Sequence, residues 1–211
     1  NLAYLDQADG ALSPTHWQAG TYPSPWREHI KVAHDGIDTQ VLSPDEHAVL
    51  VCKPAGAGAV RKWTRSDEVI TFVARNLEPY RGIHIFMRAL PELLRRRPGA
   101  QVLIVGDDAT GYGSAAPAGN TWRQVFSEEV RVQITSADWA RVHFLGRLDR
   151  DAFTSLLKVS RVHVYLSYPF VLSWSLIEAM SAGACIVASD TAPVREVVTD
   201  GLPEPADEDR S

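Results

Sequence analysis

The chain has 211 residues, of which 21 are basic and 26 acidic, so its net charge is −5 at pH 7. This balance argues against a nucleic-acid-binding surface, and the two cysteines, Cys52 and Cys185, lie too far apart for a disulfide framework or a metal site. No apolar run reaches the roughly 18 residues of a membrane span and no signal peptide is visible, so we expect a cytoplasmic protein.

The first elements of the chain are predicted to be short. Asn1 is not a natural start, and residues 1–5 read like the middle of a helix. A short strand and a loop follow, and Ser13 or Thr15 is placed to cap a helix that carries Trp17. Both hydroxyl side chains can accept a hydrogen bond from the first turn of a helix.

A turn and a hairpin are expected next. Lys31–Ala33 reads as a strand, and Gly36 after it supplies a tight turn, since glycine tolerates positive φ. In residues 39–68 two short β-prone runs, Val49–Cys52 and Val60–Trp63, flank a run rich in glycine and alanine. We expect a hairpin here and assign no chemistry to its glycines, because no helix follows them.

Two arginines follow the clearest strand of the sequence. Val69–Val73 is a run of β-branched and aromatic residues, and Arg75 and Arg81 lie in the loop at its carboxyl end. Two guanidinium groups at such a place can hold a diphosphate; the alternative is a pair of ordinary surface arginines. Beyond the loop, apolar residues recur at helical spacing over residues 83–97.

The next stretch repeats the strand and helix rhythm. Gln101–Val105 and Val142–Gly146 read as strands, and a helix over residues 122–130 lies between them. Residues 109–120 are rich in glycine, alanine and proline, which predicts an exposed, mobile excursion. Asp149 is placed to cap the helix that follows the second strand.

The most informative stretch is a strand, a loop, a short helix and a second strand. Val162–Ser167 alternates as a buried strand does, and Pro169 ends it. Gly183 ends the helix, and Ala184–Ser189 is again β-prone. In an open parallel sheet the ligand lies at the carboxyl ends of the strands, which is where this loop falls.

The helix in this stretch offers two kinds of ligand group. The amides of Ser173 and Trp174 open it and favour an anion such as phosphate. Glu178 can accept hydrogen bonds from a ribose diol. The alternative for Glu178 is a capping box with Ser175, in which the carboxylate contacts the backbone and needs no ligand. A sugar nucleotide supplies both a phosphate and a ribose.

The run Leu176–Gly183, with Cys185–Asp190 after it, resembles the donor-binding half of a GT-B glycosyltransferase of the family 4 type. Members usually carry two glutamates here, the first beside the donor sugar and the second beside the nucleotide ribose. Glu178 matches the second, whereas Phe170, which is not acidic, stands in the place of the first. The resemblance therefore keeps the ribose contact, whereas the sugar contact lacks its usual carboxylate.

A second match extends the resemblance. Ala74–Gly82 is similar, more loosely, to the family's Gly-Arg-x-x-x-x-Lys-Gly run, with Arg81 in the place of lysine. Family members place the nucleobase over the loop after the strand Val142–Gly146, mostly by backbone contacts. The resemblance implies these roles: Arg75, Arg81, Ser173 and Trp174 for the donor diphosphate, Glu178 for the ribose, Arg147 and Leu148 for the nucleobase, Phe170, Val171 and Leu172 near the donor sugar, and Gly36 in the interdomain hinge.

The alternation of strands and helices predicts an α/β fold, a Rossmann-like doubly wound parallel sheet covered on both faces. The resemblance makes this sheet the C-terminal half of a GT-B fold, preceded by a remnant of the N-terminal domain. We therefore divide the chain into the end of an N-terminal domain with the hinge (1–38), a hairpin insert (39–68), a nucleotide-sugar-binding domain (69–200) and a disordered tail (201–211).

The resemblance implies a retaining, metal-independent glycosyltransferase that moves a sugar from a nucleoside diphosphate sugar to an acceptor. It implies no cofactor besides that substrate. It also implies a carbohydrate or other acceptor held by a largely missing N-terminal domain, so that this piece alone would be inactive. Two alternatives stay open: another GT-B enzyme such as a sugar-nucleotide epimerase, and a non-catalytic GT-B-like nucleotide-binding or scaffolding domain, of which Phe170 would be a sign.

Overall fold

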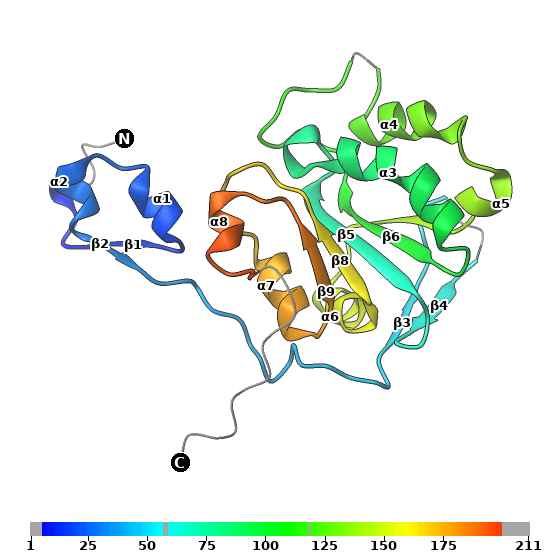
Figure 1. Cartoon of the computed structure of the whole chain (residues 1–211), viewed down its shortest axis with the longest axis horizontal. Coiled ribbons are helices and arrows are strands. Elements are labelled where there is room, and N and C mark those ends of the chain that lie inside the picture. The colour runs from blue at the N-terminus through cyan, green and yellow to red at the C-terminus, as the bar shows by residue number, and fades with distance from the viewer. Residues whose placement is uncertain (1–5, 57–58, 118, 200–211) are drawn as a thin grey trace.

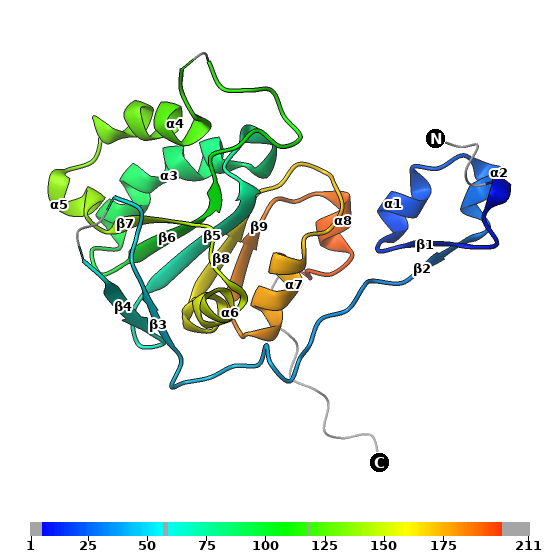
Figure 2. The ribbon, with the colours of Figure 1, turned by 180° about the vertical axis from the view of Figure 1, so that it is seen from behind.

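The computed structural model describes residues 6–56, 59–117 and 119–199 of the chain. Over these ranges the chain forms a small N-terminal lobe and a larger lobe built on a parallel sheet, joined by one extended segment (Figures 1 and 2). Residues 1–5, which read like part of a helix, Gly58 of the glycine-rich run, and the predicted tail at 201–211 lie outside the described residues.

The N-terminal lobe pairs two short strands in parallel. The hydroxyl oxygen of Thr15 accepts a hydrogen bond from the amide of Gln18 at 3.1 Å, so Thr15 rather than Ser13 caps the helix predicted around Trp17. The elements of this lobe are β1 (Ala11–Ser13), α1 (His16–Gly20), α2 (Ser24–Arg27) and β2 (Ile30–Val32).

The hairpin that follows the extended segment belongs to the larger lobe. Its strands β3 (Val49–Cys52) and β4 (Arg61–Thr64) pair antiparallel. Leu50 and Trp63 of the hairpin are buried in one cluster with Leu156 of the larger lobe. The hairpin therefore extends the core of that lobe.

Five parallel strands form the centre of the larger lobe. Their order is β7-β6-β5-β8-β9, so the chain begins in the middle, builds outward to β7 and then returns to add β8 and β9 on the other side. This is the doubly wound sheet that the sequence predicts, and β5 and β8 flank its switch point. The strands are β5 (Val69–Asn76), β6 (Gln101–Asp107), β7 (Val142–Gly146), β8 (Val162–Tyr165) and β9 (Cys185–Ala188).

Helices cover both faces of the sheet (Figures 1 and 2). On one face, Phe86 and Leu90 pack against Phe72 of β5. On the other face, Leu156 packs against Leu103 of β6. These elements are the 3-10 turn η2 (Pro79–Arg81), α3 (Ile83–Arg96), α4 (Trp122–Arg131), α5 (Ser136–Trp139), α6 (Arg150–Val159), α7 (Trp174–Ser181) and α8 (Ala192–Arg195). Among the described residues, no helix is long and apolar enough to cross a membrane.

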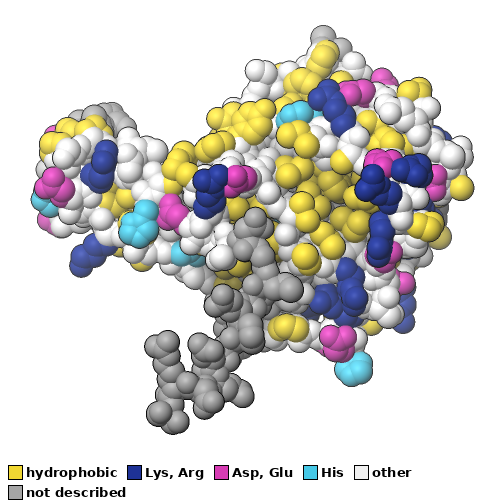
Figure 3. Space-filling view, viewed as in Figure 1, with side chains coloured by type: hydrophobic (Ala, Val, Ile, Leu, Met, Phe, Trp, Pro, Cys, Tyr) yellow, Lys and Arg dark blue, Asp and Glu magenta, His cyan; other side chains and the backbone are white. Residues whose placement is uncertain are grey.

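Hydrophobic side chains reach the surface at one edge of the sheet. The edge strand is β9, where Cys185 is exposed and Val187 is 50% exposed. Figure 3 shows hydrophobic side chains across the middle of the larger lobe, seen from the same side as Figure 1. The described part of the chain therefore leaves this edge open to solvent.

Hydrogen bonds, and the burial of Leu42 against Leu157 and Ala179, join the N-terminal lobe and the segment after it to the larger lobe. The carboxylate of Glu196, directly after α8, accepts hydrogen bonds from the amides of His16 and Trp17 at 2.7 and 2.6 Å. The indole N–H of Trp174, the first residue of α7, donates to Asp35 at 2.9 Å. The N-terminal lobe therefore meets the larger lobe directly after α8, and the segment after the lobe reaches α7.

A buried histidine lies at the centre of the sheet. The Nδ1 atom of His163, on β8, lies 2.9 Å from the hydroxyl oxygen of Thr71. Burial lowers the pKa of His163 to about 4, because the core disfavours the charged imidazole. In the unfolded chain the pKa of a histidine is about 6.5. As the pH falls, the unfolded state therefore binds this proton first, and the folded state loses stability between about pH 6.5 and pH 4.

Replacing this histidine should make stability less dependent on pH. Between about pH 7 and pH 4, we expect the free energy of unfolding to fall about 3 kcal/mol less in His163→Asn than in the wild type, because asparagine does not titrate. The measurement is urea unfolding of both proteins across this range. His143, whose pKa burial also lowers to about 4, titrates in both proteins and cancels. Parallel pH profiles would contradict the assignment.

Candidate functional site

The loops that leave β5 and β8 meet at the switch point of the sheet. Gly82 has φ +78°, and a Cβ atom at this position would lie 2.4 Å from the carbonyl oxygen of Leu166. The amide of Tyr168 donates to the carbonyl oxygen of Tyr80 at 3.1 Å. The two loops therefore pack backbone against backbone, and glycine leaves the room they need. In an open α/β sheet, ligands bind in the crevice at this place.

Arg81, the last residue of η2, lies at this crevice. Its Nη1 atom is 3.5 Å from the hydroxyl oxygen of Ser167. Its guanidinium carbon is 5.2 Å from the ring centre of Phe170 and 5.5 Å from that of Tyr112. Within the ranges that the structure describes, Arg81 forms no ion pair. The two aromatic rings stabilise the guanidinium cation by cation–π interaction, and its N–H groups remain available to an anion.

Arg75 and Arg147 line one pocket of about 420 Å³ at the carboxyl ends of β5, β6 and β7. The prediction that Arg75 lies in the loop is wrong, because β5 extends to Asn76, whereas Arg147 directly follows β7. The Nε atom of Arg147 lies 3.9 Å from a carboxylate oxygen of Asp107. Leu148 instead packs its side chain against the hairpin cluster, and its contact with a nucleobase stays a prediction. The pocket is lined by Arg75, Asn76, Asp107, Ala109, Thr110, Gly111, Tyr112 and Arg147.

Glu178 is buried on α7 and faces a cation. The Nη1 atom of Arg150, the first residue of α6, donates to its Oε1 atom at 2.7 Å. The capping-box alternative is wrong, because the N-cap of α7 is Ser173 and Ser175 lies inside the first turn. Glu178 thus points toward α6 instead of back to its own helix end, and its ribose role stays a prediction.

The N-terminus of α7 is already held by side chains. The amide of Ser173 donates to the hydroxyl oxygen of Tyr165 at 3.3 Å, so this predicted phosphate donor has a protein partner in the present structure. The side chain of Trp174 holds Asp35, and Gly36 follows with φ +80°. The predicted anion-binding turn and the predicted hinge glycine are therefore neighbours, and their roles stay predictions.

The three residues predicted near the donor sugar differ in placement. Phe170 contacts Arg81 and lies 4.8 Å, ring centre to ring centre, from Tyr112. Leu172 is buried in the core, and Val171 is half-buried. An aromatic surface therefore stands where the family pattern has a carboxylate.

Sequence reasoning missed Glu78, Tyr112 and Arg150. Glu78 is fully buried and accepts hydrogen bonds from the amides of the segment Gly111–Gly113. The sequence predicts an exposed, mobile excursion over residues 109–120. Most of the described residues there are exposed, and the carboxylate of Glu78 holds the segment Gly111–Gly113. The available signal was the Gly-Tyr-Gly run, in which a single aromatic residue stands in a loop of small residues.

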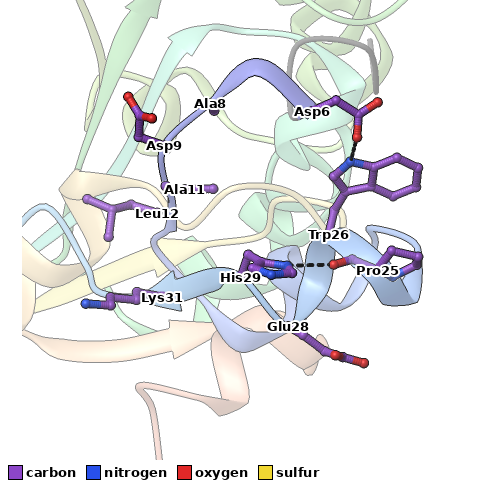
Figure 4. A pocket seen from close by; sticks show the side chains of 11 residues that line it. Asp6, Ala8, Asp9, Ala11, Leu12, Pro25, Trp26, Glu28, His29 and Lys31 are labelled. Atoms are coloured by element: carbon purple, nitrogen blue, oxygen red, sulfur yellow. Dashed lines mark hydrogen bonds between the residues drawn. The ribbon is translucent and has the colours of Figure 1, made fainter.

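A larger pocket lies elsewhere, on the N-terminal lobe (Figure 4). It has a volume of about 860 Å³, and beside it the indole N–H of Trp26 donates to Asp6 at 2.8 Å. None of the predicted site residues lines it. Within the described ranges, no three His, Cys, Asp or Glu side chains gather so that they could hold a metal ion. We therefore place the candidate site at the switch point.

Two sequence families match the chain. The family described as glycosyl transferases group 1 matches residues 67–209, and the one described as glycosyl transferase family 4 group matches residues 1–42. The first match covers more than half of the chain and includes the whole sheet.

Two curated relatives match most of this chain, but the match covers only about a third of each relative. The phosphatidyl-myo-inositol mannosyltransferase of Mycobacterium tuberculosis is 30% identical over 152 residues, 70% of this chain and 34% of that protein. The D-inositol 3-phosphate glycosyltransferase of Nocardia farcinica is 26% identical over 177 residues, 83% of this chain and 35% of that protein. The chain thus spans about a third of the length of these curated relatives.

A solved structure shares the fold. The crystal structure of Anabaena HepE in complex with UDP and glucose matches with a TM-score of 0.62 at 22% identity, over 92% of this chain and 48% of that one. At this identity the likeness shows the fold alone. It confirms the GT-B type of doubly wound sheet that the sequence predicts.

Because the two loops pack closely at the switch point, replacing Gly82 should cost more stability than replacing Gly36, although both glycines have positive φ. Gly82→Ala combines positive φ with a clash against Leu166, so we expect it to lower the free energy of unfolding by more than about 3 kcal/mol. Gly36→Ala has the same sign of φ (+80°) but open space around the new methyl group, so it should cost only about 1 kcal/mol.

Urea unfolding of both variants and the wild type measures this difference. Equal losses of stability would contradict the packing of the two loops.

Proposed function

This chain belongs to the glycosyl transferases of group 1, and on that basis we propose that its sheet and flanking helices form the donor-binding domain of a retaining glycosyltransferase. The donor is a nucleoside diphosphate sugar, and the reaction needs no metal ion or other cofactor. The observation that carries the proposal is that both arginines share Tyr112 as a neighbour at the carboxyl side of β5: Tyr112 lines the pocket of Arg75, and its ring lies 5.5 Å from the guanidinium carbon of Arg81.

The chemistry of the leaving group explains the use of two arginines. When the bond between the sugar and the diphosphate breaks, negative charge builds up on the diphosphate. Preformed cationic donors aimed at that charge lower the barrier. Arg75 and Arg81 have no carboxylate partner among the described residues. Their charge is therefore available to the diphosphate.

The nucleoside half of the donor would extend from the arginines toward α6 and α7. Glu178 offers its carboxylate to the ribose hydroxyl groups, and Arg150 holds that carboxylate in place through Oε1. The pocket beside Arg147 would receive the base. A donor bound in this way would expose its sugar toward Phe170.

Transfer to an acceptor is proposed for a longer protein, because the chain spans about a third of the length of its curated relatives. The acceptor would bind on the side of the N-terminal lobe, which meets the larger lobe directly after α8.

A second candidate function is a nucleotide-binding or scaffolding domain without transfer activity. Phe170, an apolar ring where the family pattern has a glutamate, favours it. A longer form of the protein that bound the nucleotide but transferred no sugar would support this candidate over the transferase.

Nucleoside diphosphate binding tests the proposal on the present chain. Calorimetric titration with UDP, GDP and ADP should show a preference for one base that is unchanged by EDTA. Arg81→Ala should weaken binding about 10- to 100-fold, the effect of losing hydrogen bonds to a charged group. Arg95→Ala, at the exposed end of α3, is the matched control and should bind as the wild type does. Equal binding by both variants would contradict the role of Arg81.

The ribose contact has a separate test. Glu178→Gln should weaken the nucleoside diphosphate about tenfold or more, because a neutral amide accepts hydrogen bonds from the diol less strongly than a carboxylate. The same nucleotide without its 2′- and 3′-hydroxyl groups should bind both proteins alike. A similar loss with both ligands would show that Glu178 acts on the fold and not on the ribose.

A further inference from the structure

A buried carboxylate beside the candidate site has no role in the function proposed so far. Glu78 lies in the loop after β5 with no exposed surface. It accepts three backbone hydrogen bonds, from Gly111 and Tyr112 at 3.2 Å and from Gly113 at 3.0 Å. A carboxylate is buried at great cost unless its hydrogen bonds are satisfied, and here one short segment satisfies them.

The segment is shaped to approach this carboxylate. A Cβ atom on Gly111 would lie 2.6 Å from Oε1 of Glu78 and 2.6 Å from the side-chain nitrogen of Asn76. A Cβ atom on Gly113 would lie 3.3 Å from Oε2 of Glu78. Glycine on both sides of Tyr112 therefore lets the backbone reach Glu78.

The contact fixes where Tyr112 lies. Its ring is 4.8 Å from that of Phe170 and 5.5 Å from the guanidinium carbon of Arg81. Tyr112 also lines the pocket that Arg75 shares, together with residues 109–111. In Figures 1 and 2 this loop, between β6 and α4, lies beside the start of α3. By holding this segment, Glu78 positions Tyr112, which both lines the pocket and contacts Arg81.

We propose that Glu78 is a positioning residue of the donor site, which holds Gly111–Gly113 so that Tyr112 and Phe170 fix Arg81 for the donor diphosphate. This inference rests on the proposed function. Rings against the faces of a guanidinium group restrict a flexible side chain and leave its N–H edge to the phosphate oxygens. Because the carboxylate of Glu78 is occupied by the three amides, it does not compete with the diphosphate for Arg81.

The first readout does not depend on a ligand. In Glu78→Gln one of the two acceptor oxygens becomes an N–H donor that faces backbone amides. We expect hydrogen exchange at the amides of Gly111, Tyr112 and Gly113 to become at least about tenfold faster. Glu128→Gln, an exposed glutamate on α4, removes the same charge and should leave these rates unchanged.

The second readout is the affinity for the nucleoside diphosphate that the wild type prefers, compared with its monophosphate. Glu78→Gln and Tyr112→Ala should each lower the ratio of diphosphate to monophosphate affinity about tenfold. Tyr112→Phe, which keeps the ring, should have the ratio of the wild type. In an Arg81→Ala background, Glu78→Gln should change this ratio no further, because a residue that acts through Arg81 has nothing left to position.

The outcomes separate the two claims. A wild type that binds no nucleoside diphosphate overturns the proposed function and this inference with it. A wild type that binds, with unchanged exchange or an unchanged affinity ratio in Glu78→Gln, overturns the inference alone. An equal further loss in the Arg81→Ala background also overturns it. If Glu78→Gln fails to fold, Tyr112→Ala and Tyr112→Phe carry the same test without touching the carboxylate.

Discussion

The close contact between two loops at the switch point is the constraint on which the candidate site depends. Gly82 approaches the backbone of Leu166 so closely that no side chain fits, and the hydrogen bond from Tyr168 to Tyr80 fixes their register. The doubly wound strand order separates β5 and β8 in the sequence and brings their carboxyl ends together in space. Arg81 lies next to this contact, so its place follows from the backbone packing.

At this site aromatic rings, and not an acidic side chain, fix the position of the Arg81 guanidinium group. A carboxylate beside Arg81 would fix the guanidinium group but would also neutralise it and repel a diphosphate. The rings of Tyr112 and Phe170 hold the same group without removing its charge. The carboxylates around the candidate site have partners other than Arg81: backbone amides for Glu78, Arg150 for Glu178, and Arg147 for Asp107, which lines the pocket. The crevice therefore keeps a positive centre for a doubly charged ligand.

Local features of the chain were predictable from sequence, and contacts between distant segments were not. The strands, the cap at Thr15 and the cap at Asp149, which accepts from Ala152 at 2.8 Å, depend on residues a few positions apart. Glu78 and Gly111 are 33 positions apart, and Arg150 and Glu178 are 28 apart. Single-sequence spacing carries no signal for such pairs. One local prediction was also wrong: Ser175 is not the cap of α7, because the helix begins at Trp174 and its N-cap is Ser173.

A crystal structure of this chain with its preferred nucleoside diphosphate would test the central claim most directly. We predict that phosphate oxygens lie within hydrogen-bond distance of the guanidinium groups of Arg75 and Arg81, with the ribose at Glu178. A nucleotide bound instead in the pocket of the N-terminal lobe, or one whose phosphates avoid both arginines, would contradict it.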